Sequence, residues 1–193
     1  MKIGILASTN GTILPAIWEY LKDDPSVEFV VLVSNREQCG ARKKAEEKGI
    51  PSIFVGAKGK TREEWDAEVL SIFRKYDVEL VILVGFMRIL SPVFVRAFPQ
   101  KILNVHPSLL PKFAGGMDGD VHSAVLQSGE TESGATIHLV DEGVDTGKII
   151  LQKSVAISSD ETPESLKAKV QDIEGLIFAE SIRKFSFPQD SKD

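Results

Sequence analysis

The sequence predicts an α/β fold of the Rossmann-like, doubly wound kind, with a sheet that is parallel in the N-terminal half and mixed or antiparallel in the C-terminal half. In the first hundred residues, short apolar runs alternate with segments of helical periodicity. Apolar runs without alternating polar residues are typical of parallel strands covered on both faces. Beyond residue 130, two strand-like runs flank a short turn with no helix between them, which is the arrangement of antiparallel neighbours.

The first half contains three predicted β-α units and a fourth strand. Strands are expected at residues 2–8, 27–34, 51–55 and 78–84, and helices from residue 13 to about 22, at 40–48 and from residue 62. Gly49 is positioned to end the second helix, and residues 61–64 (Thr-Arg-Glu-Glu) have the pattern of a capping box. Strands and helices that alternate this regularly favour right-handed crossovers within one sheet.

The second half begins with an apolar run at 102–106 and continues with a helix at 121–127, strands at 134–140 and 148–155, and a helix from 163 to about 184. We find no repeat or linker. We therefore expect one domain over residues 1–193, with a nucleotide-binding-like half (1–100), a half that carries the chemistry (101–187) and a polar tail (188–193).

Composition excludes several classes of protein. A net charge of −5 argues against a general nucleic-acid surface, and no apolar run reaches the length of a membrane span. The single cysteine, Cys39, and the absence of a signal-like start favour a cytoplasmic protein. His106, His122 and His138 lie far apart without a nearby cysteine, so no metal site is expected.

The strongest candidate for a reactive segment is the strand end at residues 102–111. Asn104 and His106 are two residues apart, so both side chains leave the strand on the same side, and Pro107 and Pro111 break the chain just beyond. The crevice beyond the carboxyl ends of parallel strands is where ligands bind in such sheets. The alternative is that Asn104 caps a turn and His106 is a satisfied histidine at a strand end.

Three other segments allow two interpretations. The turn at 9–12 precedes a helix whose free N–H groups could bind an anion, although the dinucleotide and P-loop glycine patterns are absent. Residues 85–92 are either a hydrophobic connector with a solvated Arg88 or an apolar slot with Arg88 near an anion. Asp145, in the acidic turn at 141–147, is either ordinary turn chemistry or a functional carboxylate.

Three sequence blocks occur together and in order: GFMRILS at 85–91, NVHPSLLP at 104–111, and GATIH at 134–138 followed by VDTG at 144–147. With them, nearly the whole chain resembles the folate-dependent formyltransferase family, most closely the members that formylate glycinamide ribonucleotide in purine synthesis. The resemblance favours the functional interpretation of Asn104, His106 and Asp145. It also implies the formyltransferase fold, with residues 101–187 as the folate and catalytic half.

The resemblance implies formyl transfer from 10-formyltetrahydrofolate, as co-substrate, to a primary amine without a metal. Asn104 and a protonated His106 would stabilise the negative charge on the formyl oxygen. Asp145 would orient the imidazole and accept, through water, the proton shed by the amine. His138 is either a supporting residue behind this set or simple strand packing.

Binding residues also follow from the resemblance. The acceptor would be held by Asn10, Gly11, Thr12, Ile13, Gln171 and Glu174, and the folate by Arg62, Met87, Arg88, Ile89, Leu90, Asp141, Glu142 and Val144. Ile13 stands where the family usually has asparagine, which removes one expected contact to the nucleotide. The alternative for Gln171 and Glu174 is that they are ordinary solvated helix residues.

Rival activities are formylation of another sugar amine, hydrolysis of 10-formyltetrahydrofolate, and a folate-binding module without turnover. We expect none of the additional domains of the family's deformylases or transfer-RNA formyltransferases. The glycine-rich stretch at 113–120 is either a lid or a lengthened connector. We expect small-molecule partners and no nucleic acid or membrane, with a monomer or a homodimer left open.

Overall fold

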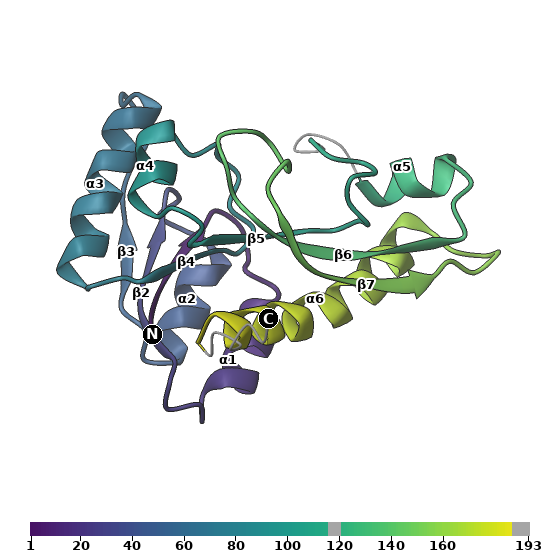
Figure 1. The fold of residues 1–193 in the computed structure, drawn as a ribbon, viewed down its shortest axis with the longest axis horizontal. Helices are drawn as coiled ribbons and strands as arrows, with labels where there is room; N and C mark the ends of the chain where they lie inside the picture. The colour runs from purple at the N-terminus through teal and green to yellow at the C-terminus, as the bar shows by residue number, and fades with distance from the viewer. Residues whose placement is uncertain (116–120, 187–193) are drawn as a thin grey trace, which may run out of the picture.

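The computed structural model describes residues 1–115 and 121–186, and their strands form a single seven-stranded sheet in the order β3-β2-β1-β4-β5-β6-β7 (Figure 1). Strands β1 to β5 are parallel, whereas β6 runs antiparallel to β5 and β7 antiparallel to β6. This confirms the predicted fold class. The strands are β1 Lys2–Ala7, β2 Glu28–Ser34, β3 Ser52–Phe54, β4 Leu80–Leu83, β5 Ile102–His106, β6 Glu132–Leu139 and β7 Ile149–Ala156.

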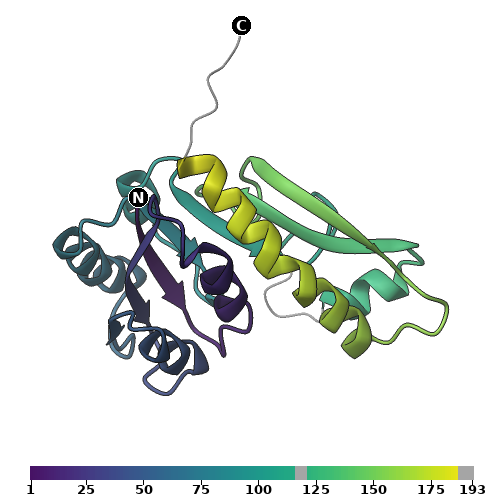
Figure 2. The same cartoon turned by 90° about the horizontal axis from the view of Figure 1, so that it is seen from below.

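The helices are α1 Leu14–Leu21, α2 Gly40–Glu47, α3 Arg62–Lys75, α4 Pro92–Ala97, α5 Val121–Gln127 and α6 Pro163–Ser186. They cover the sheet in two groups with separate cores. Apolar residues of α1, α2, α5 and α6 pack on one side, and those of α3 and α4 on the other. In Figure 2, α6 lies in front of the antiparallel strands β6 and β7, and it also packs against α1.

Alternation along the buried strands explains why both groups of helices find an apolar surface. In β2, Leu32 belongs to the core under α1, whereas Val31 and Val33 belong to the core under α3. Successive side chains point to opposite faces of a sheet, so an unbroken apolar run is what a strand covered on both faces requires. The first four predicted strands are longer than the observed ones by one to three residues, whereas the run at 102–106 coincides with β5, β6 begins two residues earlier than predicted and β7 is shifted by one residue.

Local capping fixes the start of α3 and the start of a helix that the periodicity did not predict. Glu64 N–H donates to Thr61 Oγ1 and Thr61 N–H donates to the Glu64 carboxylate, which confirms the capping box. The additional helix is α4, whose first turn is closed by Phe94 N–H donating to Ser91 Oγ. Six residues are too few for a recognisable helical period, so α4 was hidden in the connector after residue 85.

In the antiparallel half of the sheet, one face packs in the hydrophobic core and the other carries polar side chains. Ala135, Ile137 and Leu139 of β6 pack in the core beside α6. Thr136 and His138 alternate with them and therefore point to the opposite face, where Thr136 bonds with Ser108 and Leu110, and His138 meets Asp145 of the turn at 141–147. The predictions for residues 116–120 and 188–193 lie outside the described part of the chain. Within residues 1–115 and 121–186, no helix combines the length and the apolar character that a bilayer span needs.

Candidate functional site

Two cavities meet at the carboxyl end of β5. The large cavity, of about 560 Å³, is formed mainly by the turn at 9–13, the end of β5 and one face of α6. The small cavity lies between the segment at 83–90 and the turn after β6. Phe86, Asn104 and Asp145 line both cavities, His106 lines the large one and His138 the small one. The residues proposed from sequence to carry the chemistry therefore stand at the boundary between two binding spaces.

Asn104 and His106 reach this boundary because β5 ends there. The antiparallel register sets Asn104 opposite His138 and His106 opposite Thr136. Asn104 Nδ2 lies 3.1 Å from His138 Nε2, and His138 Nδ1 donates to the carbonyl of Leu139 at 2.9 Å. With Nδ1 occupied in this way, Nε2 faces both the amide of Asn104 and the carboxylate of Asp145: it accepts from the amide when the ring is neutral and donates to the carboxylate when the ring is charged.

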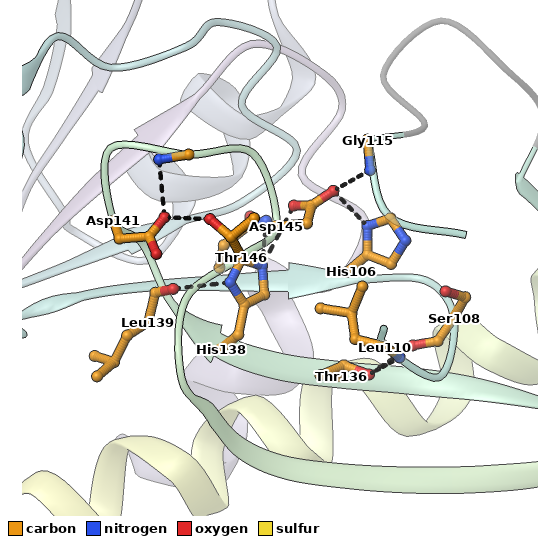
Figure 3. Close-up of polar contacts among 12 residues, drawn as sticks. His106, Ser108, Leu110, Gly115, Thr136, His138, Leu139, Asp141, Asp145 and Thr146 are labelled. Carbon is orange, nitrogen blue, oxygen red and sulfur yellow. Dashed lines mark hydrogen bonds and ion pairs between the residues drawn. The ribbon is translucent and has the colours of Figure 1, made fainter. Parts of the chain in front are cut away.

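Asp145 enters from the turn after β6 and touches both imidazoles (Figure 3). Its Oδ2 lies 3.2 Å from His106 Nδ1 and accepts from Gly115 N–H at 3.0 Å, and its Oδ1 lies 3.5 Å from His138 Nε2. The backbone of Asp145 is left-handed, with φ +54. Asx-type bonding supports the turn, since Asp141 Oδ1 accepts from Gly143 N–H and Thr146 Oγ1. A non-glycine residue in this conformation costs free energy, so surrounding contacts must hold it in place.

The contacts of Asp145 keep it ionised. The hydrogen bond from His106 is the largest cause that lowers the pKa of its carboxyl, followed by that from His138, and together they outweigh the opposing effect of burial. The side chain of Asp145 is 11% exposed. A carboxylate this enclosed is a fixed negative charge that stabilises a neighbouring imidazolium.

The partners of His106 define its protonation pattern. Nδ1 faces the Asp145 carboxylate, and Nε2 lies 2.9 Å from the backbone carbonyl of Phe113. Both partners can only accept, so both contacts are satisfied only when each ring nitrogen carries a proton. The arrangement therefore suits an imidazolium whose Nε2–H can be redirected from Phe113 to another oxygen.

Glu174 on α6 is a second acid of the large cavity. Only 7% of it is exposed, and burial raises the pKa of its carboxyl to about 7, against the opposing charges of His106 and Lys167. Gln171 and Lys167 lie on the same helix at spacings of three and four residues and line the same cavity. Glu174 is thus a buried residue, and the interpretation of it as a solvated helix position is wrong.

The turn at 9–13 forms the far wall of the large cavity. Gly11 has φ +56, and a Cβ there would lie 2.7 Å from the Cβ of Ala41, so the turn requires glycine. Ile13 is 6% exposed and stands at the N-cap of α1 without a side-chain cap. The start of α1 offers fewer free N–H groups than expected from sequence, because Leu14 N–H donates to the Gly11 carbonyl and Pro15 has no N–H.

Most of the predicted folate residues lie at the small cavity. Arg88, Ile89, Leu90, Asp141 and Val144 line it. The Arg88 guanidinium lies 5.0 Å from the centre of the Trp65 ring, and its Nε is buried without a hydrogen-bond partner among the described residues. Such an orphaned donor is expected where an anionic or carbonyl group of a ligand binds.

Three predicted folate residues do not line the small cavity. Met87 lines the large cavity, where its N–H donates to Ser8 Oγ. Arg62 is exposed at the start of α3 and pairs with Glu63, and Glu142 pairs with Arg96 at 2.8 Å. Neither Arg62 nor Glu142 is among the described residues that line either cavity.

Sequence reasoning did not single out several residues that line the cavities, among them Thr9, Phe86, Val121, His122 and Lys167. Thr9 and Phe86 follow the ends of β1 and β4, so their place at the carboxyl edge of the sheet was a usable signal. The sequence contains no such signal for Lys167, because a single charged residue on a helix has no pattern that distinguishes it from other surface residues. Among residues 1–115 and 121–186, no three His, Cys, Asp or Glu side chains are grouped to hold a metal ion.

Comparison with known proteins agrees with this architecture. Residues 1–182 match the family model described as formyl transferase. The chain belongs to the formyl transferase family.

A chloroplastic phosphoribosylglycinamide formyltransferase of Arabidopsis thaliana is 39% identical over 188 residues, which cover 94% of this chain and 64% of the relative. The trifunctional purine biosynthetic protein adenosine-3 of Gallus gallus is 39% identical over 185 residues, covering 95% of this chain and 18% of the relative. The chain thus spans less than two thirds of the length of either. Glycinamide ribonucleotide transformylase 1 from Symbiobacterium toebii superposes with a TM-score of 0.91 at 34% identity, covering 96% of this chain and 87% of that one.

Proposed function

We propose that the protein transfers the formyl group of 10-formyltetrahydrofolate to the primary amine of glycinamide ribonucleotide, a step of purine synthesis. The observation that carries this proposal is that Asn104 and Asp145 line both cavities, with a histidine on each side. A group transfer between two substrates needs hydrogen-bond donors and a base at the place where the two substrates meet. The names of the relatives support the choice of the two substrates.

In the proposed reaction, the amine nitrogen attacks the formyl carbon and the carbonyl electron pair moves onto oxygen. Asn104 Nδ2–H and His106 Nε2–H are the donors for that oxyanion, once His106 exchanges the Phe113 carbonyl for the substrate. One such donor contributes about 3–4 kcal/mol to stabilising the transition state. Asp145 holds the imidazolium during this attack.

Proton transfers complete the exchange. The attacking nitrogen becomes cationic and loses a proton to Asp145 through a water molecule. The bond between the formyl carbon and N10 then breaks, the oxyanion electron pair re-forms the carbonyl, and N10 takes a proton from His106 as it leaves. The proton received by Asp145 then passes to His106, 3.2 Å away, and restores the starting state. The products are a formamide and tetrahydrofolate, and no covalent enzyme intermediate is needed. His138 acts as a positioning residue, since it fixes both Asn104 and Asp145.

We assign the small cavity to the pterin ring and the large one to the ribonucleotide. The small cavity measures about 90 Å³, below the roughly 300 Å³ at which ligand pockets begin, so binding requires residues 141–144 to move outward. These four residues are exposed, whereas Asp145 keeps its contacts with His106, His138 and Gly115. Arg88 then meets an anionic or carbonyl group of the folate.

The compartment, the partners and the oligomeric state complete the proposal. Cys39 is a free thiol, which suits a reducing compartment such as the cytoplasm. The substrates assign the protein small-molecule partners, and a monomer and a homodimer are both compatible with the site, which a single chain contributes.

The test is to mix the protein with 10-formyltetrahydrofolate with and without glycinamide ribonucleotide and to follow tetrahydrofolate by absorbance. Release that depends on the amine supports the proposal. Release without it would identify a hydrolase, and folate binding without release would identify an inert binding module. Release with a different sugar amine alone would reassign the acceptor.

A further inference from the structure

A row of three side chains crosses the antiparallel part of the sheet in register. His106 of β5 lies opposite Thr136 of β6, and Thr136 lies opposite Gln152 of β7. Residues that are directly opposite each other in antiparallel strands project from the same face, so the row leads from the proposed catalytic imidazole to the edge of the sheet. Thr136 is fully buried, whereas Gln152 is exposed. The proposed reaction uses only His106 of these three.

Thr136 attaches the backbone that follows the proposed catalytic histidine to the sheet (Figure 3). Its hydroxyl donates to the carbonyl of Ser108 at 2.6 Å and accepts from Leu110 N–H at 3.1 Å. Ser108 Oγ in turn donates to the carbonyl of Lys112 at 2.9 Å. Residues 108–112 therefore form one hydrogen-bonded turn that is fixed to β6.

Gln152 completes this attachment from the outer strand. Its side-chain nitrogen, Nε2, donates to the carbonyl of Leu110 at 2.7 Å and to Thr136 Oγ1 at 2.9 Å. A hydroxyl has one proton and two lone pairs, and the contacts of Thr136 with Ser108, Leu110 and Gln152 engage all three. Removing the amide of Gln152 would leave the Leu110 carbonyl and one lone pair of Thr136 without this donor.

The turn held in this way presents two backbone groups to the reacting residues. The carbonyl of Phe113 lies 2.9 Å from His106 Nε2, and Gly115 N–H donates to Asp145 Oδ2 at 3.0 Å. Both groups follow the turn at 108–112 within three residues, so the position of the turn sets the position of the imidazole and of its carboxylate partner. A misplacement of about 1 Å can lower the rate of a positioned reaction about 10²-fold.

We propose that Gln152 is a positioning residue for formyl transfer, which acts through Leu110 and Thr136 on the turn that follows His106. This inference rests on the proposed function and deepens it, because Gln152 is not among the described residues that line either cavity. Without contact to a substrate, Gln152 contributes to the chemical step and not to binding. A role confined to the stability of the sheet edge would leave the turnover of the folded protein unchanged.

The first experiment compares Gln152→Met with Leu151→Ala by steady-state kinetics and thermal unfolding. Gln152→Met keeps the length of the side chain and removes both donated hydrogen bonds, so we expect kcat to fall about tenfold with KM for both substrates unchanged. Leu151 is the matched control, because it is the preceding residue of β7 and its side chain packs against the core on the other face. Leu151→Ala should lower the melting temperature more than Gln152→Met does and leave kcat unchanged. Unchanged kcat in Gln152→Met, or an equal fall of kcat in both variants, would overturn the inference.

The second experiment needs no turnover. NMR follows the hydrogen exchange of the Leu110 amide, which donates to Thr136, and the ring nitrogen signals of ¹⁵N-labelled histidine. We expect Gln152→Met to speed the Leu110 exchange about tenfold, the size of one hydrogen bond, and to shift the Nε2 signal of His106. Leu151→Ala should leave the His106 signal in place. If these changes appear but no formyl transfer is ever detected, the proposed function fails and the coupling of Gln152 to His106 stands. A His106 signal that is the same in Gln152→Met and the wild type would show that the inference is wrong.

Discussion

The two cavities differ in construction although they share a boundary. The small one lies between the segment at 83–90 and the end of β6 with its turn, and it mixes apolar walls with polar side chains, among them Arg88, whose Nε has no hydrogen-bond partner among the described residues. The large one is bounded by a helix start and by α6, and it contains a buried acid and a lysine. The difference teaches that recognition is separable in this molecule: a substitution on one side should affect one substrate, and only a substitution at the boundary should affect both.

Substitutions at the boundary should have the largest effect. His106→Ala removes the proposed donor and Asp145→Asn removes the charge that holds it, so we expect turnover to fall by about 10³-fold or more in each. Because the two act as a unit, the double variant should be little worse than either single one. Circular dichroism should show a retained fold. Near-normal turnover in either variant would contradict the assigned roles.

The buried acid of the large cavity should control stability. The pKa of Glu174 is raised from 4.5 to about 7, so the folded protein retains a proton that the unfolded chain releases between these values. The stability due to the neutral form is therefore complete below pH 4.5 and is lost as pH rises through about 7.

Glu174→Gln should abolish that loss. Relative to the wild type, the variant should gain up to about 3 kcal/mol of unfolding free energy between pH 5 and pH 8, a discounted estimate for one buried carboxyl. Urea unfolding at the two pH values measures it. Parallel pH profiles for variant and wild type would show that Glu174 is not a buried, proton-retaining group.

The guanidinium of the small cavity should affect the donor alone. Arg88→Ala removes the orphaned donor beside Trp65, and we expect KM for 10-formyltetrahydrofolate to rise about tenfold with KM for the ribonucleotide unchanged. Arg62→Ala is the matched control, because Arg62 lines neither cavity among the described residues. An equal effect of the two substitutions would assign a folate contact to Arg62 as well.

The smallest effect is expected from restoring a polar group to the turn. Ile13→Asn should lower KM for the ribonucleotide several-fold, the range of one hydrogen bond, and leave the folate unaffected. Burial of Ile13 opposes the gain, since an amide there must find its partners. Fluorescence titration with the ribonucleotide measures it, and weaker binding would mean that the turn does not receive the phosphate.

Features with a local signal in the sequence could be predicted, and features that depend on long-range contacts could not. The parallel half follows from local signals: unbroken apolar runs, the capping box at Thr61 and the glycine at 49. Asn104 and His106 were identified because strand alternation and the two prolines are local as well. Asp145 came from resemblance, since the contact with His106 joins residues 39 positions apart in sequence and has no local signature.

Other features depend on tertiary context. Glu174 is buried because α6 packs against β6 and α1, and the helical periodicity of the sequence does not show this. Arg62 and Glu142 were expected near the folate, yet each has an ion-pair partner at the surface. Helix α4 is too short for a periodic pattern, and its start depends on Asp66 of α3, whose carboxylate accepts from Ser91 N–H.

The central claim is that Asn104, His106 and Asp145 act on one carbonyl shared by the two cavities. The most direct measurement uses 10-formyltetrahydrofolate carrying ¹³C in the formyl group, followed by NMR in the presence of glycinamide ribonucleotide. We expect the label to appear in the formamide of the ribonucleotide with the wild type and at a rate about 10³-fold lower with Asp145→Asn. Label that appears as free formate, or transfer at the same rate in both proteins, would contradict the claim.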